Sequence, residues 1–391
     1  MSNLNTWPCF SQAEVDAVSK VLLSNKVNYW TGEEGKKFET EFASWCDAKY
    51  SVALSNGTIA LEIALKALDI GPGDEVIVTP RSFIASVSCV ISVGARPVFA
   101  DVDLNSGNIN ADSIKGLITQ KTKAIICVHL AGFPCEMDEI MSLSIKNNIY
   151  VIEDCAQSHG AKYKGKPVGS IGHIGCWSFC QDKIMTTGGE GGMIATNNES
   201  LWRKIWSMKD HGKTIQSVYE KKHPPGYRWL HDSFGSNFRM TEMQATIGRI
   251  QLKRIAGWTN KRSQNANTIL DILKKHDSLI RIPKVKNIFE HAWYKLNVYV
   301  KVDGLAINWN RDRISEEINK MGIPCYSGSC SEIYLEKAFD DCFRPNKRLK
   351  NAKELGSTTL MFLVHPNLSK IDVKNICSSI DLVLKKATKL K

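Results

Sequence analysis

One lysine stands out by its neighbours. Lys183 follows the run GCWSFCQD, which begins as an apolar strand, and precedes the glycine-rich stretch GGEGGM. A glycine-rich turn lets a bulky ligand lie against the main chain. An amine whose charge is disfavoured by burial becomes a nucleophile toward an aldehyde. A solvated surface lysine is the ordinary alternative, but the surrounding glycines favour a nucleophilic role for Lys183.

A second candidate is a carboxylate at the end of an apolar run. Residues 151–156 read VIEDCA, so the predicted strand ends on Glu-Asp. At that position Asp154 could bind a metal ion, a sugar hydroxyl or a protonated ring nitrogen. It could also be an ordinary helix cap, and the motif by itself leaves these alternatives open.

A third candidate is a phosphate site in the stretch SNGTIAL. A predicted strand runs through Asn56, Gly57 and Thr58 directly into an apolar helix. Gly57 allows close approach of the backbone, and the first N–H groups of a helix attract anions. A plain N-cap by Asn56 or Thr58 would give the same local pattern.

These candidates require elements that bring them together. Candidate strands cover residues 76–80, 124–130 and 150–156, and residues 58–68 have the all-round apolar pattern of a buried helix. Continuous apolar strands separated by crossovers predict an α/β fold with a mostly parallel sheet covered by helices on both faces. Ligands of such sheets bind at the carboxyl ends of the strands, where Asp154 would lie.

The pattern changes near residue 255, where longer amphipathic helices replace the alternating strands and helices. We therefore expect a large cofactor-binding domain over residues 1–254 and a smaller α/β domain over residues 255–391. A chain of 391 residues is long enough for both.

The composition limits the cellular compartments and the binding partners that we expect for this protein. The first ten residues, MSNLNTWPCF, do not resemble a secretory signal, and no apolar run approaches the ~20 residues of a membrane helix. The twelve cysteines are scattered without the spacing of a zinc site, so we expect reduced thiols, no metal and a cytoplasmic protein. The net charge of +11 is spread thinly and accompanies no nucleic-acid module, which favours a solvated surface or an anionic substrate.

Together with neighbouring motifs, the three candidates make the chain resemble a known family. The chain is similar to the DegT/DnrJ/EryC1/StrS sugar aminotransferases, which have the aspartate-aminotransferase fold (fold type I) and use pyridoxal 5′-phosphate. The resemblance covers residues 28–255 most strongly. The matching stretches include SNGTIALEIAL, GPGDEVIVTPRSFIAS, VIEDCAQSHGAKYKGKPVGS and SNFRMTEMQATIGRIQLKRI.

The resemblance implies a role for each matching residue. Lys183 would form the Schiff base with the cofactor and carry the proton during transfer, and Asp154 would keep the pyridine nitrogen protonated. The remaining cofactor contacts implied by the family are Gln157 to the ring oxygen, Phe83 on the ring face, Gly57, Thr58 and Ser178 to the phosphate, and Asn237 to the phosphate of a partner subunit.

A shared site of this kind implies a homodimer, although Asn237 could instead be a simple turn residue. Two departures from the family concern the site itself. Gly188 adds one residue between Lys183 and the Gly-Glu-Gly-Gly motif, and residues 325–330 read CYSGSC where many members carry a histidine.

The expected reaction is transfer of an amino group from L-glutamate to a nucleotide-linked 4-keto-6-deoxyhexose, for a bacterial surface polysaccharide such as O-antigen. Amination of a 3-keto sugar and sugar dehydration are the alternatives within the family. Because Lys183 is retained, transfer is favoured over dehydration. A nicotinamide dehydrogenase would require GxGxxG after the first strand, and this pattern is absent there.

Overall fold

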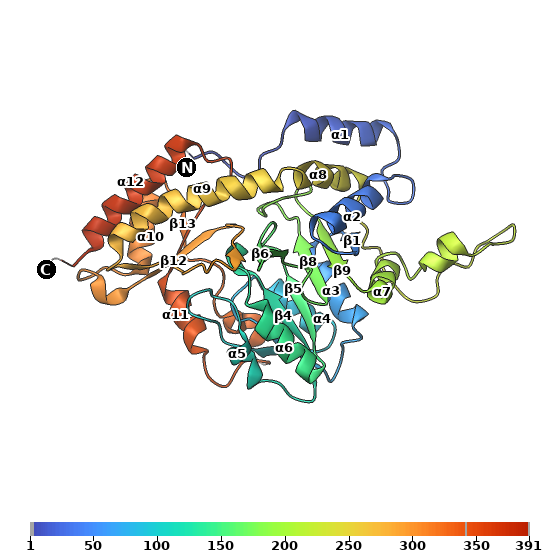
Figure 1. The fold of residues 1–391 in the computed structure, drawn as a ribbon, viewed down its shortest axis with the longest axis horizontal. Helices are drawn as coiled ribbons and strands as arrows, with labels where there is room; N and C mark the ends of the chain where they lie inside the picture. The colour runs from blue at the N-terminus through green and yellow to red at the C-terminus, as the bar shows by residue number, and fades with distance from the viewer. Residues whose placement is uncertain (1–3, 341, 390–391) are drawn as a thin grey trace.

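The central feature of the protein is a seven-stranded mixed sheet. The computed structural model describes residues 4–340 and 342–389 and is drawn in Figure 1. In spatial order the strands are β1 (Tyr50–Leu54), β9 (Gly192–Thr196), β8 (Ile174–Ser178), β5 (Tyr150–Asp154), β4 (Thr122–Val128), β2 (Glu75–Val78) and β3 (Arg96–Phe99). Only β9 runs against the others, pairing antiparallel with both β1 and β8.

Alternation along the strands gives the sheet two buried faces. Val76 and Val78 of β2 point into one core, whereas Ile77 points into another. This period of two follows from strand geometry, and a sheet buried on both faces therefore needs apolar residues at every position. Burial of both faces explains why the strands appear in the sequence as continuous apolar runs.

Helices cover both faces of the sheet. The core on one face contains residues of α3 (Gly57–Ala67), α4 (Ala85–Ser92) and α7 (Glu199–Lys209). The opposite face carries α2 (Glu34–Trp45) and α8 (Glu242–Leu252) over one half, and α5 (Ala111–Lys115), α6 (Met137–Asn147) and α11 (Lys350–Thr358) over the other. Helix α1 (Gln12–Leu23) packs against α8.

A second sheet lies in the C-terminal part of the chain. Its four antiparallel strands, in spatial order, are β10 (Ile280–Arg281), β12 (Leu296–Val300), β14 (Thr359–Phe362) and β13 (Cys325–Tyr326). The core beside it contains residues of α9 (Ile255–Leu273), α10 (Arg311–Lys320) and α12 (Lys370–Ala387). A small third sheet joins β11 (Phe289–Glu290), β6 (Lys162–Tyr163) and β7 (Lys166–Pro167).

The architecture confirms the expected α/β class with a mostly parallel large sheet and a further C-terminal α/β unit. The boundary expected at residue 255 coincides with the start of α9, and the division into two domains stays a prediction. Two segments pack against the part of the chain on the other side of this boundary. Leu4 packs into the C-terminal core, and Tyr334 and Phe339 pack against Phe99 of the large sheet.

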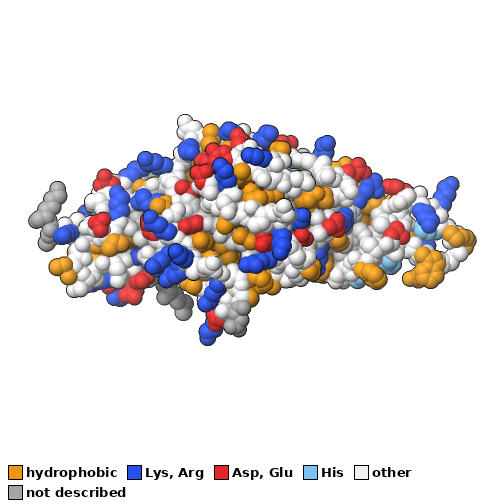
Figure 2. All heavy atoms as spheres, turned by 90° about the horizontal axis from the view of Figure 1, so that it is seen from below, with side chains coloured by type: hydrophobic (Ala, Val, Ile, Leu, Met, Phe, Trp, Pro, Cys, Tyr) orange, Lys and Arg blue, Asp and Glu red, His pale blue; other side chains and the backbone are white. Residues whose placement is uncertain are grey.

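The surface is mixed in charge. Figure 2 shows lysine and arginine side chains distributed among acidic and apolar ones over the visible face, with no single large basic field. Among the described residues, no helix combines the length and the apolar character needed to span a lipid bilayer.

Candidate active site

Seven of the residues singled out in the sequence line one cavity of about 610 Å³, which we call the inner cavity. It lies at the carboxyl ends of β5 and β8, where a mostly parallel sheet presents its ligands. The seven residues are Gly57, Thr58, Phe83, Asp154, Gln157, Ser178 and Lys183.

Lys183 is held in place by its neighbours on three sides. Its Nζ lies 3.3 Å from Oδ1 of Asp182 and 5.5 Å from the centre of the Tyr294 ring. The backbone carbonyl of Lys183 accepts a hydrogen bond of 2.8 Å from the indole N–H of Trp7. With its side chain 17% exposed, Lys183 is partly shielded from water but reaches the cavity.

The glycine-rich turn behind Lys183 uses the conformations that only glycine adopts readily. Gly188 and Gly189 have φ values of 89° and 120°. The extra glycine noted in the sequence therefore lies inside the turn. Lys183 still lines the inner cavity, so the insertion leaves the lysine at the site.

Asp154 is buried at the end of β5 and receives few hydrogen bonds. Its Oδ2 accepts from the hydroxyl of Ser86 at 2.7 Å, and its Oδ1 accepts from the N–H of Ala156 at 3.1 Å. Burial raises the pKa of Asp154, although these hydrogen bonds and the charges of Lys183 and His129 act in the opposite direction. A cation bound in the inner cavity would offset the cost of burying this carboxylate.

The start of α3 provides the anion-binding part of the inner cavity. Gly57 and Thr58 are the first residues of this helix, so no intrahelical bond uses their N–H groups. A Cβ at Gly57 would lie 2.6 Å from the Cβ of Ser178, which requires glycine there. Asn56 also caps the helix by accepting from the N–H of Ile59 at 2.9 Å. The same motif can therefore form the helix cap and also bind a phosphate.

A second cavity of about 660 Å³, the outer cavity, shares Phe83, Gln157 and Lys183 with the inner one. Phe83 is 67% exposed and lines both spaces. Gln157 accepts from the N–H of Ala131 at 2.7 Å. The C-terminal part of the chain lines the rest of the outer cavity, including Tyr294, Lys295, Tyr326, Cys330 and Met361.

Asn237 is the one expected site residue that is not brought to either cavity. It is exposed, and its backbone pairs with that of Asp210. Arg239, a basic residue close to it, donates to Oδ1 of the buried Asp210 at 2.7 Å. This ion pair gives Arg239 a structural partner within its own chain.

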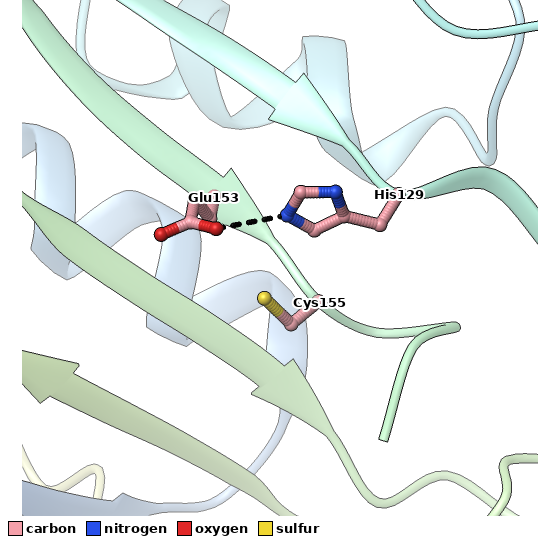
Figure 3. A group of neighbouring side chains, drawn as sticks. All are labelled: His129, Glu153 and Cys155. Atoms are coloured by element: carbon pink, nitrogen blue, oxygen red, sulfur yellow. Dashed lines mark hydrogen bonds and ion pairs between the residues drawn. The ribbon is translucent and has the colours of Figure 1, made fainter. Parts of the chain in front are cut away.

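Glu153, next to Asp154, belongs to a separate buried cluster with His129 and Cys155 (Figure 3). Its Oε2 lies 3.0 Å from Nε2 of His129 and accepts from the N–H of Gly169 at 2.8 Å. Its Oε1 accepts from two further backbone N–H groups of the same loop, those of residues 171 and 172, at 2.9 and 2.6 Å.

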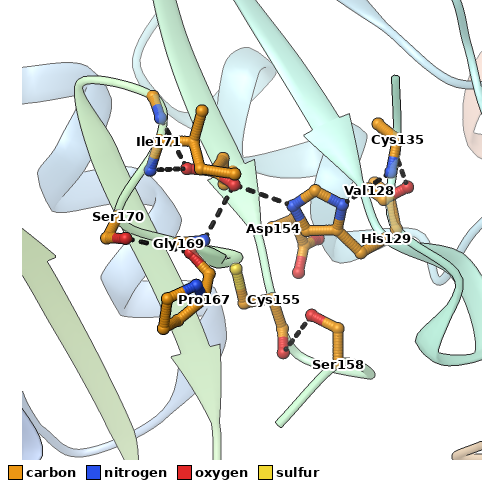
Figure 4. Close-up of polar contacts among 12 residues, drawn as sticks. Val128, His129, Cys135, Asp154, Cys155, Ser158, Pro167, Gly169, Ser170 and Ile171 are labelled. Carbon is orange, nitrogen blue, oxygen red and sulfur yellow. Dashed lines mark hydrogen bonds and ion pairs between the residues drawn. The ribbon is translucent and has the colours of Figure 1, made fainter. Parts of the chain in front are cut away.

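The proton of the His129 ring can be assigned from this network (Figure 4). Nδ1 of His129 accepts from the N–H of Cys135 at 3.0 Å, so Nε2 carries the proton and donates to Glu153. Burial raises the pKa of the Cys155 thiol, which disfavours the thiolate that binds metals. The three side chains are spaced as in a metal site, but both oxygens of Glu153 and Nδ1 of His129 already accept hydrogen bonds from the protein. We therefore assign the cluster a structural role.

The sequence did not point to several residues that the fold brings to the site. Ser86 orients Asp154 and is itself 2.9 Å from the hydroxyl of Ser82. Asp182 and Tyr294 flank Lys183, and Lys295 lines the outer cavity. Asp182 adjoins Lys183 in the sequence and could have been noticed, whereas Tyr294 and Lys295 lie more than a hundred residues away and carry no local signal.

We predict that Glu153→Gln lowers the free energy of unfolding by about 3 kcal/mol or more, because the amide turns an N–H donor toward backbone donors and leaves them unpaired. Urea unfolding followed by circular dichroism measures the effect. The exposed Glu354→Gln is the matched control, expected to change stability by less than about 0.5 kcal/mol. If both variants unfold at the same urea concentration, or if a chelator destabilises the wild-type protein, the structural role is wrong.

Sequence comparison places the chain among sugar aminotransferases. The sequence profile described as the DegT/DnrJ/EryC1/StrS aminotransferase family matches residues 8–381. The chain is 34% identical over 379 residues to a GDP-perosamine synthase of Escherichia coli O157:H7, covering 96% of each chain. It is 38% identical over 285 residues to a dTDP-3-amino-3,6-dideoxy-alpha-D-galactopyranose transaminase of Aneurinibacillus thermoaerophilus, covering 73% of this chain and 74% of the relative.

Solved structures agree with the sequence matches. An aminotransferase from Psychrobacter cryohalolentis superposes with a TM-score of 0.97 at 61% identity, covering 98% of this chain and 99% of the other. A Streptococcus pneumoniae protein, described as the PLP-form of a sugar aminotransferase, superposes with a TM-score of 0.85 at 25% identity, covering 98% of both.

These likenesses confirm the expected fold type I architecture and the expected cofactor, pyridoxal phosphate. The inner cavity fits that group, because it offers a lysine, a buried carboxylate lacking a cation and a helix N-terminus around one space. The chain belongs to the DegT/DnrJ/EryC1/StrS aminotransferase family and is a transaminase that uses pyridoxal phosphate.

Proposed function

We propose that the protein transfers the amino group of L-glutamate to C4 of a nucleotide-linked 4-keto-6-deoxyhexose. One observation carries the proposal: Lys183 lies between an inner cavity with the features of a cofactor site and an outer cavity of about 660 Å³. An open space of that size accommodates part of a sugar nucleotide beside the cofactor. The choice of C4 is supported by the match to GDP-perosamine synthase over 96% of both chains.

In this proposal the inner cavity holds the cofactor through residues of known position. Bound pyridoxal phosphate supplies an electron sink for the bond changes at the substrate carbon. The amine of Lys183 would hold the cofactor covalently and, once the amine of the donor has displaced it, would be free to move the proton at that carbon. Asp154, oriented by Ser86, pairs with the ring nitrogen and keeps it protonated.

The other contacts follow from the same cavity. Gly57, Thr58 and Ser178 would bind the phosphate with the N–H groups at the start of α3 and a hydroxyl. Phe83 would stack on the ring from the side of the outer cavity, and Gln157 would donate to the ring oxygen with its amide N–H₂.

Amination at C3 is a second candidate with an observation in its favour. The relative with 38% identity is named for a 3-amino sugar, although it covers only 73% of this chain. A dehydratase is disfavoured, because dehydrating members replace the lysine that this chain keeps as Lys183.

The biological role is part of the proposal. A nucleotide-linked amino sugar is an activated donor for glycan assembly, and we assign the product to a bacterial surface polysaccharide such as O-antigen. The structure describes all twelve cysteines as free thiols, most of them buried, which supports a reducing compartment such as the cytoplasm.

We also propose that the protein works as a homodimer with shared sites. Residues 213–236 form an arm that extends from the body beyond α7 (Figure 1), and it carries the exposed aromatics Tyr227, Trp229 and Phe234. Figure 2 shows apolar side chains at the same end of the molecule. Exposed apolar groups of this kind are typical of interaction surfaces. Asn237, at the base of the arm, would then serve the partner subunit's cofactor.

We predict that Asp154→Asn keeps the fold and part of the cofactor binding but loses nearly all turnover. An amide cannot stabilise a protonated ring nitrogen, and a charge-assisted contact of this kind is worth roughly 1.5–3 kcal/mol in the ground state. The loss in the transition state should be larger. Steady-state kinetics measures kcat, with circular dichroism as the control for folding. A variant with near wild-type kcat would make Asp154 only a structural residue.

The substrate proposal is tested with L-glutamate and a panel of nucleotide-linked 3-keto and 4-keto sugars, with the products identified by mass spectrometry and NMR. We expect a 4-amino sugar and ping-pong kinetics, because donor and acceptor use the same cavity in turn. Glutamate alone should change the visible spectrum of the bound cofactor. Conversion of only the 3-keto sugars would refute the C4 assignment and leave the enzyme class unchanged.

The shared site is tested by mixing inactive Lys183→Ala subunits with inactive Asn237→Ala subunits. In a mixed dimer, one of the two sites would combine an intact Lys183 with an intact Asn237, so part of the activity should return. Differently tagged subunits, purified in tandem, establish that exchange has occurred. Exchanged dimers without activity would contradict the role of Asn237.

A further inference from the structure

A smaller chamber of about 250 Å³ opens beside the outer cavity, and we call it the side chamber. The two spaces share Asp182, Tyr294, Lys295, Tyr326 and Leu363. The rest of the side chamber is formed by the N-terminal segment 4–7 and by residues of α9 and of the stretches around positions 324 and 365. The side chamber therefore adjoins the outer cavity, which Lys183 lines.

Lys295 is the cation at the junction of the side chamber and the outer cavity. Its Nζ lies 4.8 Å from the centre of the Tyr294 ring, and Nζ of Lys183 lies 5.5 Å from the same point. The two amines are thus no farther apart than the sum of these distances. Within the described part of the chain, no carboxylate lies within 4.0 Å of the Lys295 ammonium group, whereas Asp182 pairs with Lys183.

The protein leaves the charge of Lys295 poorly compensated. Burial lowers the pKa of Lys295 to about 8, although the charge of Asp182 acts in the opposite direction. At neutral pH the group is still mostly protonated. Burial removes the water that would stabilise the ammonium charge, and an anion beside Lys295 would stabilise that charge instead.

Arg262 adds a second buried cation to the wall of the side chamber. It is 1% exposed, and its Nη1 donates to the carbonyls of Trp293 and Tyr294 at 3.4 and 3.3 Å. Its Nε and Nη2 have no hydrogen-bond partner among the described residues. These donors are buried, and the Cζ of Arg262 lies 5.1 Å from the centre of the Trp7 ring, so Arg262 supplies positive potential to the side chamber rather than a direct hydrogen bond.

His365 adds an imidazole to the polar lining of the side chamber. Its ring stacks near Trp7, whose indole N–H also donates to the backbone carbonyl of Lys183. Its Nδ1 lacks a hydrogen-bond partner in the described structure. Burial, together with the charges of Arg262 and Lys295, lowers the pKa of His365 to about 4, so the ring is neutral. The lining of the side chamber thus has two cations, a neutral imidazole and one carboxylate, that of Asp182, which accepts a hydrogen bond from the Tyr294 hydroxyl.

We propose that the side chamber is the binding site for a carboxylate of the amino donor, with Lys295 as its direct partner and Arg262 as a second source of positive charge. This inference rests on the proposed function and adds the donor subsite to it. The donor must place its amino group near Lys183 and, at the same time, its carboxylate beside a cation of the protein. Lys295 is the cation that satisfies both conditions, because it shares the Tyr294 ring with Lys183.

The size of the chamber favours a carboxylate over the diphosphate of the sugar nucleotide. At about 250 Å³ the side chamber is less than half the size of the outer cavity of about 660 Å³, which leaves the larger space for the larger acceptor. Donor and acceptor would then share Lys183 but use different anion contacts. The affinities for the two substrates should respond separately to substitution at Lys295.

The test compares Lys295→Met, Lys295→Arg and the exposed control Lys320→Met in the cofactor-loaded protein. Glutamate is titrated without acceptor while the visible spectrum of the bound cofactor is recorded. We expect Lys295→Met to weaken glutamate about tenfold or more, as the loss of one charged contact implies, with partial rescue in Lys295→Arg. The kcat/KM for the sugar nucleotide should fall by much less than the kcat/KM for glutamate, although Lys295 also lines the outer cavity. Lys320→Met should match the wild type.

A second readout uses glutarate, a dicarboxylate that has no amino group to transfer. It should raise the melting temperature of the wild-type protein and of Lys320→Met but not of Lys295→Met. Unchanged glutamate affinity in Lys295→Met, or a raised KM for the sugar nucleotide alone, overturns the proposal. If the wild-type protein itself rejects glutamate, the donor assignment has failed instead, and the same titration with the accepted amino acid decides the role of Lys295.

Discussion

The buried carboxylate of Glu153 is the interaction on which the geometry of the site depends. It ties the end of β5 to His129 at the end of β4 and to the loop 169–172 that leads into β8. These contacts join the carboxyl ends of β4 and β5 to the loop that enters β8. Asp154 is the next residue in β5, so its position is set by the network that fixes Glu153.

Strand alternation separates the roles of these two acids. Successive side chains of a strand point to opposite faces, so Glu153 turns into the packed interior and Asp154 turns toward the inner cavity. Both are buried, but the carboxylate of Glu153 is satisfied by four contacts, whereas that of Asp154 accepts only two hydrogen bonds. The carboxylate with fewer partners is the one placed to meet a cationic ligand.

The same reasoning applies to the basic groups around the cavities. Arg249 is fully paired with Glu34 and Glu41 and stabilises the contact between α2 and α8. Lys295 and Arg262 have no such acidic partners in the described structure, although burial disfavours their charges. Charges left without partners at a cavity are typical of binding sites, because a ligand supplies the missing interaction.

The sequence by itself predicted the α/β class and, through its resemblance to a known family, the cofactor. It also pointed to Lys183, Asp154, Gly57 and Ser178 as neighbours in one cavity, since each lies in a contiguous motif at a turn or a strand end. The antiparallel direction of β9 had no local signal, because an apolar strand reads the same in either direction. Ser86, Tyr294, Lys295 and Arg262 reach the site from α4, α9 and the C-terminal part of the chain. Only the tertiary structure placed them there, because side-chain contacts between distant segments depend on packing across the sheets, whereas periodicity and turn chemistry act over a few residues.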